Sequence, residues 1–144
     1  QMCIRDRLGD DPATLSSNRN ARIALQRLAF HLTAAGRSDQ AAAKYERLLA
    51  AFPDDATALR GAGAAKHAAG AWDEAAELWA RLANGLDSGS EGWYEARWHE
   101  LDSLRRVRPD DTRKLWKQFR LLHPDIPFAP WRDRFAALGA QIGE

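Results

Sequence analysis

The chain repeats itself with a period of 34 residues. When the sequence is shifted by 34 positions, identical or similar residues align, and the pairs are Leu25/Leu59, Ala35/Ala69, Gly36/Gly70, Asp39/Asp73, Ala41/Ala75, Ala42/Ala76, Tyr45/Trp79 and Leu48/Leu82. A period of about 34 residues with small residues at fixed places is typical of stacked helical hairpins. Because one hairpin cannot bury its own apolar face, the period predicts an all-α fold of several antiparallel helical hairpins.

The pattern within each period resembles the tetratricopeptide repeat (TPR) family. Counting Arg22 as repeat position 1, the first unit matches at Leu25, Leu28, Ala29, Leu32, Ala41, Tyr45, Leu48 (in place of a small residue) and Pro53. The second unit, from Ala56, matches at Leu59, Ala62, Gly63, Ala75 and Trp79 and departs from the pattern at Lys66, Leu82 and Asp87. A degenerate third unit runs from about Glu91 to Pro124. The resemblance implies a short right-handed α-solenoid with repeats at about 22–55, 56–89 and 91–124.

Several matches have a physical reason of their own. Small residues allow antiparallel helices to approach closely, so Ala29 is expected to face Ala41, and Gly63 to face Ala75. Gly36 and Gly70 are expected in the left-handed conformation that ends the first helix of each hairpin. The bulky side chains of Tyr45 and Trp79 are expected to fill the space between successive hairpins.

A capping helix is expected at about 130–142. Pro130 suits a helix start, and Trp131, Phe135, Leu138 and Ile142 recur at helical spacings. This helix would cover the third hairpin and complete a single domain over residues 18–144. Of the six tryptophans, we expect five to build the core, and Trp72, at a turn between helices, to be only partly covered.

The first residues have no periodic relation to the rest. Gln1–Arg7 resembles translated sequencing-adapter read-through, so we exclude this segment, with the only cysteine, Cys3, from fold reasoning. Residues 1–17 are expected to form a disordered or loosely ordered lead-in that adds little stability. The remainder is expected to be the C-terminal end of a longer array, whose upstream part is missing.

Charge is nearly balanced, with 21 basic and 20 acidic residues, or 19 of each without residues 1–7. This balance argues against nucleic-acid binding. The basic residues nevertheless concentrate in the third hairpin, at Arg97, Arg105, Arg106, Arg108, Arg113, Lys114, Lys117 and Arg120. They form either solvated helix faces or a basic patch for an acidic protein segment or, less well, for phosphates. No apolar run approaches the ~18 residues of a membrane span, so we expect a soluble protein without a membrane partner, and its compartment stays open.

No motif predicts catalysis or metal binding. The four histidines, His31, His67, His99 and His123, are scattered without a second ligand at a repeating spacing. The sequence carries no Gly-rich phosphate loop and no Gly-x-Ser-x-Gly motif. We therefore expect no enzyme activity, no cofactor, no metal and no small-molecule substrate.

The pattern predicts a function in protein interaction. The resemblance implies that the first helix of each hairpin lines a concave groove, where the binding candidates are Arg27, Phe30, Arg60, His67, Arg97 and Trp98. A groove with an apolar floor and an arginine rim suits a peptide or partner segment. The family's carboxylate clamp for chaperone tails is disfavoured, because its positions hold Gln26, Phe30 and Gly61.

Three alternatives remain open. The basic segment 113–122 followed by His123, Pro124 and Asp125 resembles the helix and His-Pro-Asp loop of a J-domain, which implies a co-chaperone that stimulates an Hsp70 partner. The chain could instead be an accessory segment of a longer enzyme. It could also be a spacer whose binding surface lies in other repeats.

Overall fold

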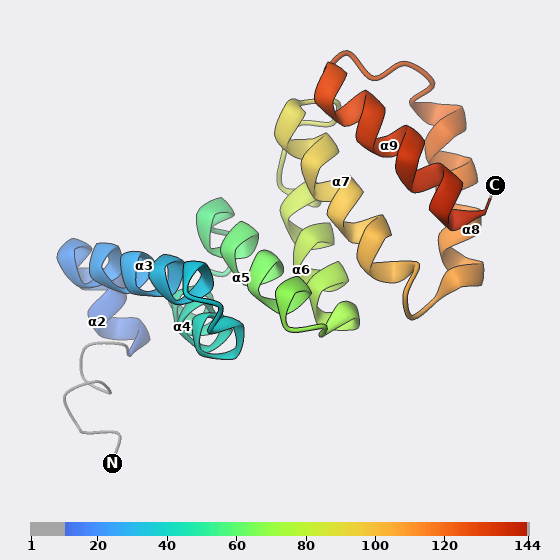
Figure 1. Ribbon diagram of the computed structural model, residues 1–144. Coiled ribbons are helices and arrows are strands. Elements are labelled where there is room, and N and C mark those ends of the chain that lie inside the picture. The colour runs from blue at the N-terminus through green and yellow to red at the C-terminus, as the bar shows by residue number, and fades with distance from the viewer. Residues whose placement is uncertain (1–10, 144) are drawn as a thin grey trace. The chain divides into compact units, whose positions relative to one another are not determined.

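A computed structural model describes residues 11–143 (Figure 1). Within that range every regular element is an α-helix, and the helices are α2 (Pro12–Ser17), α3 (Arg19–Ala34), α4 (Ser38–Ala51), α5 (Ala56–Ala68), α6 (Trp72–Asn84), α7 (Glu91–Leu104), α8 (Pro109–Leu122) and α9 (Ala129–Ile142). The predicted all-α class is confirmed. The chain divides into two compact units, Gln1–Gly70 and Ala71–Glu144, called unit 1 and unit 2 below. The solenoid form and the single domain over 18–144 stay predictions.

The first described helix of unit 1, α2, lies where the sequence analysis expected a loosely ordered lead-in. Asp11 caps α2, because its Oδ1 accepts a hydrogen bond of 2.6 Å from the backbone N–H of Thr14, and this bond lowers the pKa of the Asp11 carboxyl. Leu15 of α2 is buried, with 1 % of its surface exposed. For residues 12–17 the expectation was therefore wrong, since a cap and one buried leucine leave no periodic signal in so short a helix. The excluded segment, residues 1–7, lies outside the described residues.

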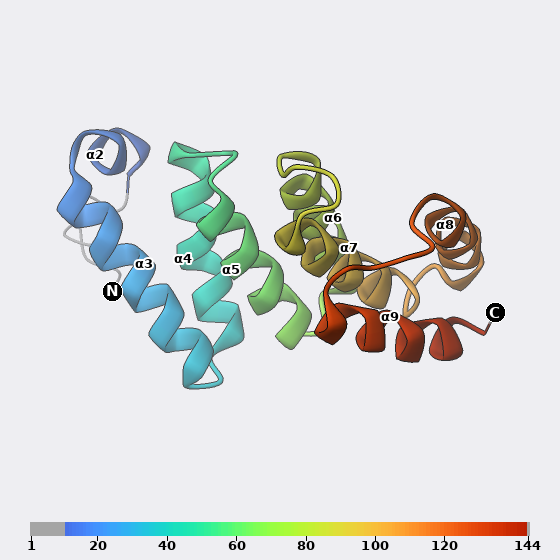
Figure 2. The same cartoon turned by 90° about the horizontal axis from the view of Figure 1, so that it is seen from above.

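The three longer helices of unit 1 pack in chain order, α3 against α4 and α4 against α5, with a smaller contact between α3 and α5 (Figure 2). Ala29 on α3 and Ala41 on α4 are completely buried, as expected for small residues where two helices approach closely. Gly36 ends the first hairpin's leading helix with φ +78°, so the predicted left-handed position is confirmed. The N–H of Arg37 then donates to the carbonyl of Leu32 at 2.8 Å, which satisfies one of the helix-end carbonyls.

Tyr45 of α4 packs against a glycine of α5. The Tyr45 side chain is 5 % exposed, and burial raises the pKa of its phenol although a hydrogen bond with Thr33 lowers it in part. A Cβ atom placed on Gly61 would collide with Cε1 and Cζ of the Tyr45 ring and lie 2.7 Å from its hydroxyl oxygen. Sequence reasoning gave Gly61 only a groove position, whereas the structure makes it the site that admits the aromatic ring between α4 and α5.

In unit 2, α6 packs along α7, α7 contacts both α8 and α9, and α8 contacts α9. The ring of Trp79 on α6 stacks on that of His99 on α7 with centroids 4.2 Å apart. Helix α9 begins at Ala129 and buries one face, so the amphipathic helix predicted at 130–142 is confirmed, and its buried side chains are Trp131, Phe135, Leu138 and Ile142. Its role as the cap of a repeat array stays a prediction.

The start of α6 is linked to the turn between α7 and α8 by cationic side chains. The Arg106 guanidinium lies 4.3 Å from the centroid of the Trp72 ring, which is partly covered as expected. A second link is the pair between Arg108 and Asp73, at 3.5 Å. Arg105 and Arg106 also face the buried carboxylate of Asp102, at 2.9 and 3.8 Å, so this charge is compensated within α7 and the turn that follows it.

Candidate functional site

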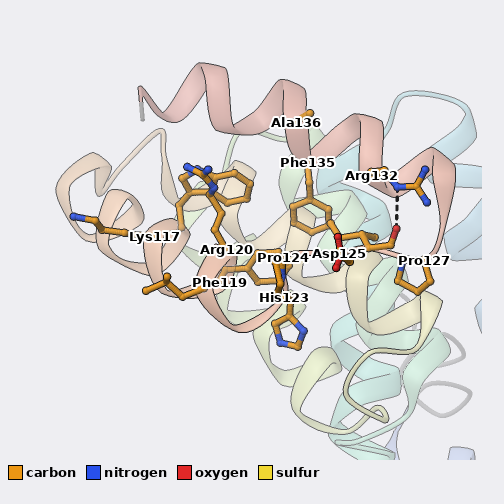
Figure 3. Close-up of a pocket in the computed structure, with 13 residues that line it drawn as sticks. Lys117, Phe119, Arg120, His123, Pro124, Asp125, Pro127, Arg132, Phe135 and Ala136 are labelled. Carbon is orange, nitrogen blue, oxygen red and sulfur yellow. Dashed lines mark hydrogen bonds between the residues drawn. The ribbon is translucent and has the colours of Figure 1, made fainter.

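Two hollows flank helix α8 in unit 2. The larger, the α8–α9 pocket, has a volume of about 950 Å³, is open to solvent, and is lined by residues of α8, of the connecting segment 123–128 and of α9 (Figure 3). The smaller, the α7–α8 groove, has a volume of about 300 Å³. Phe119 and His123 belong to the lining of both, so the end of α8 forms the wall between them.

The floor of the α8–α9 pocket is a stack of aromatic rings. Phe119 and Phe135 stack with centroids 4.8 Å apart, and Trp116 stacks on Phe119 at 5.9 Å. These rings come together because Trp116 and Phe119 lie on one face of α8 and Phe135 projects toward them from α9, as Figure 3 shows for Phe119 and Phe135. All three side chains are buried, with at most 9 % of their surface exposed. The stack therefore holds α8 against α9 and fixes the shape of the pocket.

The rim of the pocket is mainly cationic. Lys117 and Arg120 project from α8, and Arg132 projects from α9. The Arg120 guanidinium lies 5.9 Å from the centroid of Trp116, and Nε of Arg132 donates to the carbonyl of Ile126 at 3.0 Å. Among the residues that line this pocket, Asp125 is the one carboxylate. The lining therefore carries a formal net charge of +2 with histidine neutral.

The α7–α8 groove is mainly apolar. Leu115 and Leu122 of α8 are two helical turns apart and are 42 % and 67 % exposed. Opposite them, α7 contributes Trp93 and Leu101, both of which are buried. The Arg97–Glu100 ion pair, at 2.7 Å, also lines the groove.

The predicted groove residues are divided between the units. In unit 1, Arg27 and Phe30 lie on α3 and are exposed, with 64 % of Phe30 accessible. Arg60 and His67 lie on α5 and are partly covered. The Phe30 ring contacts the neighbouring His31 ring edge-on at 5.9 Å.

In unit 2, the two remaining candidates point to different neighbours. Arg97 contacts Glu100, donates to Oδ1 of Asn84 at 2.9 Å, and lies 5.5 Å from the centroid of the Trp93 ring. Trp98 instead donates from its indole nitrogen to the carbonyl of Arg134 on α9 at 3.0 Å. The structure therefore places Arg97 in the α7–α8 groove and Trp98 against α9.

The His-Pro-Asp tripeptide follows α8 directly. The His123 N–H donates to the carbonyl of Phe119 at 2.8 Å, and its ring lies 4.6 Å from that of Trp93 and 5.2 Å from that of Phe119. Pro124 and Asp125 line the α8–α9 pocket. The half-buried His123 ring therefore packs between α7 and the end of α8.

The comparisons with known proteins add no identification: no family model, curated protein or solved structure matches the chain. Among the described residues, no group of three or more histidine, cysteine, aspartate or glutamate side chains is arranged to hold a metal ion. In the same range, no helix has the length and apolar character needed to cross a membrane. The candidate site is therefore defined by its shape, its apolar lining and its charge.

Proposed function

We propose that this protein is a protein-interaction module that binds a peptide segment of a partner protein. The proposal rests mainly on the exposure of Leu115 and Leu122 beside the α7–α8 groove. Exposed apolar side chains that adjoin a concave surface mark interaction sites more often than scattered ones do. Their spacing of two helical turns suits an amphipathic partner helix, which presents apolar side chains at similar intervals.

The 34-residue period supports a finer proposal, that the helices stack as TPR-type repeats and act as a scaffold. In such an array, Arg27 and Phe30 of α3 and the partly covered Arg60 and His67 of α5 would form a second part of the binding surface. We give the α7–α8 groove priority because its apolar residues and its hollow lie within one unit. The J-domain-like alternative receives less weight, since packing already accounts for the position of His123.

The test is a selection of random peptides displayed on phage against the immobilised full chain. Selected peptides are then measured against a Leu115→Ser/Leu122→Ser variant and a matched Leu28→Ser/Phe30→Ser variant, in which two exposed apolar residues of α3 are changed. Because all four side chains are exposed, both variants are expected to stay folded, which circular dichroism checks.

For a peptide that occupies the α7–α8 groove, the α8 variant should lose about 1 to 4 kcal/mol of binding free energy and the α3 variant should bind as the parent does. Loss of binding in the α3 variant alone would move the surface to unit 1. Failure to enrich any peptide over an unrelated helical protein would refute the proposed function.

A further inference from the structure

We infer that the α7–α8 groove binds its partner helix antiparallel to α8, and that this helix carries a lysine or arginine four residues after the second of two apolar side chains spaced seven residues apart. The inference rests on the proposed function, helix binding at this groove, and adds the direction and the charge pattern of the partner. Its evidence is the distribution of charge along the groove.

The first argument is the line of side chains that α8 presents beside the groove. Successive residues of an α-helix differ by about 100° in direction and by about 1.5 Å along the axis. Asp111, Leu115 and Leu122 therefore point within about 40° of one another, with steps of about 6 Å and about 10 Å along α8. All three are exposed. A partner helix that covers the two leucines thus meets a carboxylate one helical turn beyond Leu115.

The second argument is that the protein itself does not use the Asp111 carboxylate. Among the described residues this carboxylate has neither a hydrogen bond nor an ion pair, whereas the neighbouring Asp110 faces Arg113. Lys114 points about 100° away from Leu115, so it borders the line of side chains without belonging to it. A carboxylate beside an apolar contact favours a cation on the partner and disfavours an anion there.

The third argument is the order of the charges on the opposite wall. His123, which follows α8, packs its ring on Trp93 near the start of α7, so α7 and α8 run antiparallel. Arg97 of α7 therefore lies closer to the His123 end of the groove than Glu100 does. This ion pair is neutral as a whole, but its acid lies toward the end where Asp111 lies and its base toward the other end.

These charges favour one direction for the partner helix. A helix is stabilised by acidic side chains in its first turn and by basic side chains in its last turn. When the partner runs antiparallel to α8, its basic last turn meets Asp111 and its acidic first turn lies toward Arg97. The parallel direction would require a base in the partner's first turn, where the helix dipole opposes it.

A second copy of the chain does not supply this pattern. If two copies of α8 packed antiparallel with Leu115 of each against Leu122 of the other, residue 126 of one copy would lie opposite Asp111 of the other. That residue is Ile126, which is uncharged and only 8 % exposed. The pattern therefore points to a helix of another protein.

The test uses the full chain and fluorescein-labelled, alanine-rich helical peptides with glutamates in the first turn and two leucines seven residues apart. The matched peptide carries one lysine four residues after the second leucine. Its variants replace that lysine by glutamine or glutamate, or move it to four residues before the first leucine. Binding is measured by fluorescence anisotropy for the parent, for Asp111→Lys and for the matched variant Asp133→Lys, and circular dichroism checks that each is folded. Asp133 is an exposed carboxylate near the start of α9 that lines neither hollow.

We expect the parent to bind the matched peptide at least about threefold more tightly than the glutamate peptide, because an attraction is replaced by a repulsion. Asp111→Lys should reverse this order, and Asp133→Lys should keep it. Each peptide is compared on parent and variant, so differences in its own helicity cancel. The preference should shrink with added salt, because it is a preference between charges.

The same preference in the parent and in Asp111→Lys would overturn the inference. Tighter binding of the peptide with the displaced lysine, if it depends on Asp111, would show a parallel partner and overturn it as well. A concentration-dependent dimer that Leu115→Ser/Leu122→Ser abolishes would assign the groove to a second copy, against the inference. If phage selection yields groove-dependent peptides while none of the designed peptides binds or follows the charge at position 111, the proposed function stands and only this inference falls.

Discussion

Replacing Gly61 by alanine tests the packing of α4 against α5 in unit 1. In a solvent-exposed helix interior this change stabilises by about 1 kcal/mol, because alanine loses less backbone entropy on folding than glycine does. Here the added Cβ would collide with Cε1 and Cζ of the buried Tyr45 ring. Overpacking of this kind costs about 1 to 3 kcal/mol, so the net effect should be a destabilisation of up to about 2 kcal/mol.

The sign of the effect should reverse when the ring is removed. Tyr45→Leu deletes the ring atoms that the Cβ would meet, and it keeps an apolar side chain at this buried position. In that background, Gly61→Ala should stabilise the protein by about 1 kcal/mol, as helix propensity alone predicts. The double-mutant cycle therefore isolates the contact between the two residues.

The assay is urea unfolding of the four proteins, followed by far-ultraviolet circular dichroism. Tryptophan fluorescence is unsuitable as the main signal, because all six tryptophans lie in unit 2 and Gly61 lies in unit 1. If Gly61→Ala stabilises the parent and the Tyr45→Leu variant equally, the Tyr45 ring does not occupy this site and the described packing is wrong.

Three further predictions concern a buried hydroxyl, a helix cap and the tyrosines. Ser103→Ala should stabilise the protein by about 1 kcal/mol in the same assay, because Ser103 Oγ is buried without a hydrogen-bond partner among the described residues. Ser90→Ala should cost about 1 kcal/mol, since Ser90 caps α7 by accepting from the Trp93 N–H at 3.3 Å; a loss in both variants would contradict the first prediction. Burial raises the pKa of the Tyr45 and Tyr94 phenols in the folded protein. The free energy of unfolding should therefore be unaffected by these groups below the unfolded pKa of about 10, and it should fall as the pH rises through the folded pKa values. Tyrosinate absorbance should appear at higher pH in the native than in the urea-unfolded protein, and coincident titrations would refute this.

The positions of the helices were predictable because local features mark their ends. Gly36 and Gly70 have φ values of +78° and +77°, and each follows a helix where the sequence indicated an end. Asp55 caps α5 by accepting from the Ala58 N–H at 2.9 Å. The short helix α2 escaped prediction, since its one buried leucine produces no periodicity. The predicted contact between Gly63 of unit 1 and Ala75 of unit 2 stays a prediction.

The candidate site was less predictable because it depends on the exact phase of helices and on contacts between distant segments. Consecutive residues on an α-helix differ in direction by about 100°, so a register error of one residue exchanges one neighbour for another. Arg97 and Trp98 were assigned to one groove, yet Arg97 contacts Asn84 and Trp98 contacts the Arg134 carbonyl. Both are large side chains suited to binding, and only the packing of α9 distinguishes them.

The α8–α9 pocket adds a second reason. Lys117 and Arg120 were visible in the sequence as part of a basic concentration, but nothing in their spacing indicates that Arg132 lies across from them. That placement depends on the path of the segment 123–128, which α8 and α9 fix by stacking Phe119 on Phe135. The sequence left open whether the basic residues form solvated faces or a binding patch. In the structure, five of these eight basic residues pair with carboxylates of the protein, and two others, Lys117 and Arg120, line the α8–α9 pocket together with Arg132. A binding patch on this hairpin stays a prediction.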